Sequence, residues 1–233
     1  NDSIYVGGVF IYNMDTGSLL SNYTVSPQMV DFTSWFINSH IAVNPKSGMI
    51  YIQPATLPNY KVDFHIYGLH MDGSNNTNFA PIPTSCTSMS ITQDGKYLWV
   101  VSTKSCTNNG NQYNVYSVYN ANAGGKAIWS RNNKNDVCST GRSNPSWDTF
   151  VYPFGQNLAY VYNTKSTNEN GQNPVLYEVT NTGYKLLHEI EARGDQNRAP
   201  SGIELVPTSS AQPNIIMCAW NTVSGTIDRK SVV

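Results

Sequence analysis

A short unit made only of strands and turns recurs with variation along the chain and limits what the sequence can fold into. One copy reads IAVNPKSGMIYI over residues 41–52, and another reads MSITQDGKYLWV over residues 89–100. Each copy places an apolar strand, a tight turn and a second apolar strand in succession, and a third strand follows after a gap. A repeat of about 40–50 residues built only from strands indicates small sheets that are repeated around an axis or in a stack.

The unit predicts an N-terminal pair of strands and four further sets of strands. At 233 residues the chain has an ordinary size for one all-β domain, so we interpret residues 1–233 as a single domain. No helical pattern exceeds two turns, and the best helical candidate, residues 185–193, is interpreted as strand. The expected strands are 4–12 and 18–25; 40–44, 49–53 and 62–69; 87–92, 97–103 and 113–120; 146–152, 157–162, 175–180 and 184–190; and 201–206, 214–220 and 226–233.

The turns of these units resemble those of β-propeller blades of the YVTN, NHL and lactonase-like type. The segments IYNMDTGSL at 11–19 and ITQDGKYLWV at 91–100 carry the resemblance. It implies an all-β, propeller-like array of small antiparallel sheets with four to five blades, either closed on itself or part of a larger propeller. In a closed ring, residues 4–25 would complete the blade begun by residues 201–233 and leave no open edge.

The composition excludes some partners and favours one location. Charged residues make up 12% of the chain with a net charge of −1, against roughly 25% in average proteins. Because no basic face is indicated, nucleic acid is not expected as a partner. No stretch approaches the roughly 18 apolar residues that cross a bilayer, so no membrane span is expected. A surface rich in uncharged polar residues and tyrosine is common in secreted proteins, and we predict a secreted or extracellular surface location.

The cysteines also bear on where the protein is located. Cys86 and Cys106 flank the hairpin centred on Asp94-Gly95 and are predicted to form a disulfide if the end of the hairpin frays or bulges. Cys138 and Cys218 are far apart in sequence and could form a second bridge. The alternative is four buried free thiols, which pack as small apolar side chains.

Acceptor sequences for N-glycosylation begin at Asn1, Asn22 and Asn75, whereas Asn144 is followed by proline. In a chain so rich in asparagine, such sequences also arise by chance. We predict glycosylation at Asn22 and Asn75.

The sequence predicts no metal site and no cofactor. His65 and His70 lie five residues apart on one expected strand, so their side chains point to opposite faces. The polar run 72–77 has clustered oxygens but lacks the spacing of a calcium loop, and we interpret it as a turn. The chain contains no nucleophile elbow, phosphate loop or dinucleotide fingerprint. The lactonase-like resemblance implies metal-binding side chains at a central channel, but no such set matches this sequence residue by residue.

The tryptophans supply a candidate ligand site. Trp35, Trp129 and Trp147 lie at strand starts or in connections beside Asn, Ser and Arg residues, and Arg142 precedes Trp147. Exposed indole rings stack on apolar sugar faces while neighbouring amides bond the hydroxyls, so these four residues are predicted to bind ligand. The alternative is packing between blades, which is the role expected for Trp99 and Trp220.

Three functions remain open from the sequence. The first is a secreted or cell-surface binding module that recognises a glycan or a protein partner through the connections between strands. The second is a propeller enzyme, lactonase-like or otherwise metal-dependent, and the third is a structural subunit that self-associates through open strand edges. Function is expected where the units differ, in the polar and aromatic connections 26–39, 54–60, 104–112, 129–147 and 163–174.

Overall fold

The protein is described by a computed structural model, and most of the described residues lie in strands. No helix in the described ranges is long and apolar enough to cross a membrane. The described ranges are 8–13, 15–24, 40–53, 65–72, 74–84, 86–107, 110–140, 149–166, 172–189, 198–206, 214–221 and 227–232.

The described strands form five antiparallel sheets, and each sheet pairs its strands in chain order. The first sheet contains β1 (Gly8–Tyr12) and β2 (Leu19–Thr24). Blade 1 contains β3 (His40–Val43), β4 (Ile50–Gln53), β5 (His65–Leu69) and β6 (Ile82–Pro83). Blade 2 contains β7 (Ser88–Ile91), β8 (Tyr97–Ser105), β9 (Gln112–Asn120) and β10 (Trp129–Asn132). Blade 3 contains β11 (Phe150–Pro153), β12 (Leu158–Ser166), β13 (Gln172–Thr180) and β14 (Tyr184–Glu189). The last sheet contains β15 (Arg198–Val206), β16 (Asn214–Asn221) and β17 (Ile227–Val232).

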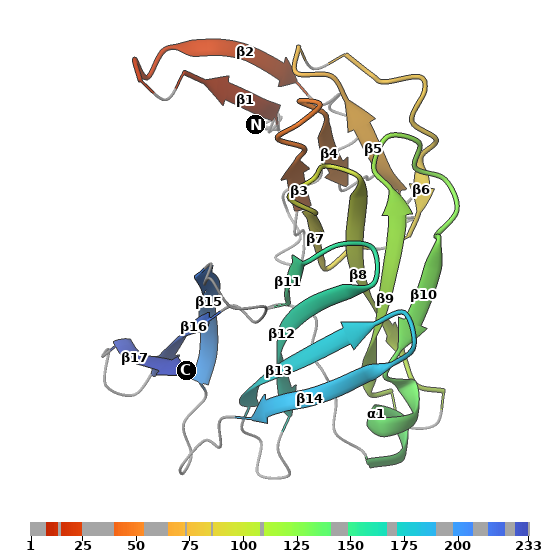
Figure 1. Ribbon diagram of the computed structural model, residues 1–233, viewed down its shortest axis with the longest axis vertical. Coiled ribbons are helices and arrows are strands. Elements are labelled where there is room, and N and C mark those ends of the chain that lie inside the picture. The colour runs from red at the N-terminus through yellow and green to blue at the C-terminus, as the bar shows by residue number, and fades with distance from the viewer. Residues whose placement is uncertain are drawn as a thin grey trace, which may run out of the picture.

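The sheets follow one another around an arc (Figure 1). β3 lies against β7, β7 against β11, and β11 against β15, so the first strand of each of these sheets is the inner one. In each blade the fourth strand, β6, β10 or β14, is the outer strand of the sheet, farthest from the first strand. This radial order is that of a β-propeller and confirms the predicted all-β array of small antiparallel sheets. The fourth strands of blades 1 and 2 were not expected from the sequence.

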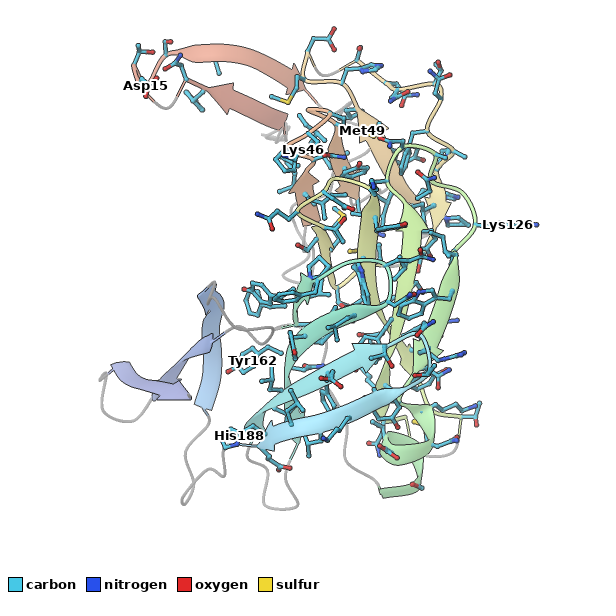
Figure 2. The ribbon with its side chains drawn as sticks, in the orientation of Figure 1. Asp15, Lys46, Met49, Lys126, Tyr162 and His188 are labelled. Carbon is cyan, nitrogen blue, oxygen red and sulfur yellow. A yellow bond between two sulfur atoms is a disulfide. The ribbon has the colours of Figure 1, made fainter. Side chains whose placement is uncertain are left out.

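The core lies between the blades, because the middle strands are buried on both faces. Along β8, Leu98 and Val100 pack in the cluster between blades 1 and 2, whereas Trp99 and Val101 pack in the cluster between blades 2 and 3. Side chains alternate between the two faces of a strand, so burial of both faces requires an unbroken apolar run. A third cluster, which includes Tyr162, lies on the other face of blade 3 (Figure 2). This face is turned toward the last sheet.

The recurring turns are held by the same chemistry in successive sheets. The side-chain oxygen of Asn44 accepts hydrogen bonds from the N–H groups of Lys46 and Ser47, as that of Asn13 accepts bonds within its own turn. The Asn44 amide also donates to the carbonyl of Gly95 at 2.8 Å, which joins the corresponding hairpins of blades 1 and 2. Gly95 has a φ of 73°, a conformation that a side chain rarely adopts. These turn residues therefore have a structural role.

The structure does not show the predicted closure of the ring by the two ends of the chain. Among the described strands, β1 pairs with β2, and β17 pairs with β16, but neither hairpin pairs with the other. Figure 1 shows β1 and β2 at one end of the arc and the last sheet at the other.

The predicted Cys86–Cys106 disulfide is wrong. Cys106 is bonded to Cys138, with the two Cα atoms 5.7 Å apart, and Cys86 is a buried free thiol. The register of β7 with β8 pairs Ser88 with Val101, and its continuation places Cys86 level with Thr103, three residues before Cys106. Cys86 instead packs in the cluster between blades 1 and 2. The side chain of Cys218 lies outside the described part of the structure, so its pairing with Cys138 is excluded by the Cys106 bond alone.

Candidate functional site

The topology gives each blade two different edges. Successive strands are antiparallel, so the first-to-second and third-to-fourth connections lie on one edge, and the second-to-third and blade-to-blade connections lie on the other. We call the first the hairpin edge, because it holds the tight turns 44–49 and 92–96. We call the second the α1 edge, because the short helix α1 (Lys134–Thr140) follows β10 there.

Several of the connections that the sequence singled out are flanked by strand ends on the α1 edge. The strands next to connections 54–60, 104–112 and 163–174 end or begin there, as do the end of β10 and the start of β3. These described strand ends therefore lie on one side of the blades. Segments 25–39, 54–64, 141–148 and 167–171 lie outside the described residues.

Helix α1 is fixed to blade 2 at both of its ends. Asn133, directly before the helix, accepts a hydrogen bond from the backbone N–H of Asn114 at 2.8 Å, and its own N–H donates to the Asn114 carbonyl at 3.2 Å. Near the other end, the Cys106–Cys138 disulfide ties the helix to the connection between β8 and β9. Val137, which belongs to the helix, has a buried side chain. A helix of seven residues has little stability alone, and these attachments supply the rest.

We call the interface between blades 2 and 3 the seam. A layer of buried polar side chains lies in it at the α1 edge, and we call this layer the seam layer. Asn114 lies two residues before Tyr116 on β9, and Thr149 lies two residues before Val151, so both point into the seam where Tyr116 and Val151 pack. The residues of the seam layer are Asn114, Tyr116, Asn133, Thr149 and Asn163, all at most 4% exposed.

The seam layer retains hydrogen-bonding groups that the fold does not use. Within the described ranges, the amide nitrogens of Asn114 and Asn133 and the hydroxyls of Tyr116 and Thr149 are buried without a hydrogen-bond partner. Leaving such a group unpaired costs about 1–3 kcal/mol. Native proteins leave few buried polar groups unpaired, so a group of them in one layer requires an explanation.

Electrostatics around the seam layer are set by burial and by tyrosine neighbours. Burial raises the pKa of Tyr116 far above its ordinary value, and the nearby Tyr177 raises it further. Asn114 is close enough to lower this pKa in part, although the pair does not meet the geometry of a hydrogen bond. Tyr116 is therefore a neutral hydroxyl at physiological pH and can both donate and accept.

Helix α1 also comes close to blade 3. Burial raises the pKa of Tyr184, and the nearby Asp136 carboxylate raises it further. Tyr184 lies on β14 and also packs edge-on against Tyr177, with ring centroids 6.2 Å apart. Asp136 on the helix thus lies near the outer strand of blade 3.

The hairpin end of the same seam has a different character. The indole N–H of Trp99 donates to the carbonyl of Gly155 at 2.7 Å, and that of Trp129 donates to the carbonyl of Gln156 at 3.0 Å. Both polar groups are used within the protein. At the hairpin edge of the seam, both indole N–H groups are therefore hydrogen-bonded. At the α1 edge, buried amide and hydroxyl groups have no hydrogen-bond partner.

The predicted ligand residues are not brought together in the described structure. Trp129 is half-buried in the seam, with its N–H bonded to blade 3. Trp35, Arg142 and Trp147 lie outside the described residues. Sequence reasoning missed the seam layer, although polar residues at Asn114 and Thr149 on faces that are otherwise apolar were a usable signal.

The other predicted sites have different outcomes. Asn75 has an exposed side chain, and Asn22 lies on β2 with a side chain outside the described set. His70 is exposed and His65 is half-buried. The described part of the chain contains no group of three or more His, Cys, Asp or Glu residues that could hold a metal ion.

Comparison with known proteins gives little information about this chain. No family model matches the sequence, and no curated protein matches it. One solved structure with similarity is a subtype N10 neuraminidase-like protein of A/little yellow-shouldered bat/Guatemala/060/2010. Its sequence is 9% identical, the TM-score is 0.41, and the match covers 82% of this chain and 57% of that one. The propeller-like arrangement therefore rests on the sheets themselves, and no finding assigns the chain to the YVTN, NHL or lactonase-like type.

Proposed function

We propose that the protein is a secreted or cell-surface binding protein whose α1 edge recognises a glycan. The observation that carries the proposal is the seam layer, whose unused amide and hydroxyl groups lie buried at the α1 edge and become available to a ligand only when that edge opens. Neutral amides and hydroxyls can donate to and accept from sugar hydroxyls. A layer of this kind suits a ligand that presents many hydroxyl groups.

The low charge and the disulfide of the chain also support this proposal. The chain has few charges, which disfavours ligands recognised by charge alone. The Cys106–Cys138 disulfide suits an oxidising compartment. No observation in the described ranges favours the metal-dependent enzyme or the self-associating structural subunit that the sequence left open.

The test places a bulky charge on each edge in turn. Asn135 on α1 and Asn122 in the connection between β9 and β10 are both exposed asparagines, on the α1 edge and the hairpin edge respectively. The labelled protein and its N135R and N122R variants are applied to an array of neutral and acidic glycans. The proposal predicts that N135R loses the glycan signal and N122R keeps it. No signal from the unmodified protein, or equal loss in both variants, would contradict it.

A further inference from the structure

We infer that Asn75 is an N-glycan acceptor whose oligosaccharide projects from the hairpin edge of blade 1. The acceptor sequence is Asn75-Asn76-Thr77. The side chains of Asn75 and Thr77 are exposed, whereas Asn76 between them is buried at 7% exposure. This inference does not rest on the glycan-binding function, because it concerns a sugar attached to the protein and a different edge of the blade.

The surrounding turn holds Asn75 in this outward position. The N–H of His70 donates to the carbonyl of Ser74 at 2.8 Å, and the N–H of Asn76 donates to the carbonyl of Gly68 at 2.9 Å. Asn75 itself forms a backbone bridge with Leu69 at the end of β5. The chain on both sides of Asn75 is therefore fixed to the blade, and the acceptor side chain points to solvent.

Two buried side chains complete the support of the turn. The side-chain oxygen of Asn76 accepts a hydrogen bond from the N–H of Asn78 at 3.0 Å. Phe79 packs in the cluster between blades 1 and 2, and the next residue, Ala80, exchanges backbone hydrogen bonds with the connection between β9 and β10. A sugar on Asn75 would displace none of these contacts, because its amide makes no hydrogen bond within the described structure.

The position of Asn75 separates the glycan from the candidate site. Asn75 follows the end of β5, and Leu69 at that end pairs with Ile50 at the start of β4, so both lie at the hairpin edge. Figure 1 shows the connection between β5 and β6 at the end of the molecule away from α1. An oligosaccharide at Asn75 therefore leaves the α1 edge uncovered.

The reaction that this site undergoes is glycosyl transfer to an amide. The donor is an oligosaccharide linked through a diphosphate to a lipid in the secretory pathway. The Asn75 Nδ2 atom forms a bond to the anomeric carbon and loses one proton, while the bond from that carbon to the diphosphate oxygen breaks. The lipid diphosphate is the leaving group. Recognition of the acceptor requires the hydroxyl of Ser or Thr two residues later, which Thr77 supplies.

The test expresses the full chain behind a secretory leader in eukaryotic cells, together with N75Q, T77A, T77S and N22Q variants. Intact mass and glycopeptides are measured in the medium and in the membrane-enclosed fraction, before and after treatment with a peptide N-glycosidase. The inference predicts a glycan on the Asn75 peptide that is lost in N75Q and T77A and kept in T77S and N22Q. T77S restores the acceptor hydroxyl, so it separates loss of the acceptor sequence from a change in folding. An unmodified Asn75 peptide in both fractions, or a glycan on that peptide that persists in T77A, would overturn the inference.

Discussion

Trp99 of β8 and Trp129 of β10 meet edge-on, with ring centroids 5.0 Å apart, and donate their indole N–H groups to successive carbonyls of blade 3. Trp99 is fully buried and Trp129 is half-buried. The pair closes the hairpin end of the seam between blades 2 and 3. It explains why an aromatic residue at the start of β10 need not be a ligand contact.

Replacement of Trp129 is therefore expected to lower stability more than its exposure suggests. W129F keeps an aromatic ring but loses the hydrogen bond to Gln156, which should cost about 1 kcal/mol. W129A also removes the ring, and large-to-small changes of this kind cost about 3–5 kcal/mol when fully buried, so a smaller loss is expected here. Urea denaturation followed by fluorescence measures both. Full stability of W129A with loss of ligand binding would instead favour the predicted ligand role.

Removal of the Cys106–Cys138 disulfide should lower the free energy of unfolding by about 2–5 kcal/mol. The effect should appear in a C106S/C138S double variant. C86A is the control, because Cys86 is a buried free thiol whose pKa is raised by burial. Peptide mapping without reduction should recover Cys106 linked to Cys138. A Cys86–Cys106 peptide would contradict the structure.

Two glycines with similar backbone angles should respond differently to alanine. Gly95 has a φ of 73°, and an added Cβ would lie 2.5 Å from the side-chain oxygen of Asn44. Gly110 has a φ of 70°, but nothing lies within 4 Å of an added Cβ. The backbone conformation alone costs about 1–2 kcal/mol in each variant. G95A should therefore be destabilised more than G110A in thermal unfolding, and equal losses would contradict the contact between the hairpins of blades 1 and 2.

The raised pKa values of two tyrosines predict a loss of stability in alkali. Burial raises the pKa of Tyr116 and Tyr184 in the folded state, whereas an unfolded tyrosine titrates near pH 10. A group with a raised folded pKa stabilises the fold below the unfolded pKa, and this contribution falls as pH rises beyond it. Stability measured from pH 8 to 11 should therefore decline above about pH 10. Y116F should decline less steeply, and an unchanged slope would contradict the burial of this hydroxyl.

The repeated architecture was predictable because it depends on local signals. The Asp-Gly and Ser-Gly turns, such as that ending at Gly95, fix hairpins, and the doubly apolar run in β8 indicates a strand buried between two sheets. The strands expected at 40–44 and 97–103 match β3 and β8 closely. These signals are local and do not depend on which residues pack on the other side of the seam.

The partner of Cys106 could not be predicted from the sequence, nor could the assembly of the seam-layer residues in one place, because both depend on contacts between distant segments. The partner of Cys106 is set by the path of α1, which returns over the β8–β9 connection, and no local pattern encodes that return. Likewise, Asn114 and Thr149 lie on different blades, and only the packing of the two sheets places them in one layer. The short strand β6 was missed because two residues carry no periodic pattern.

We propose that the unused groups of the seam layer bind a glycan and do not stabilise the fold. Y116F and T149V each remove one unpaired hydroxyl with little change in shape. Binding of both variants to the glycans that the unmodified protein recognises is measured beside their free energies of unfolding. The account predicts unchanged or higher stability and glycan binding weakened by about three- to tenfold, the value of one lost hydrogen bond. Lower stability with unchanged glycan binding would contradict it.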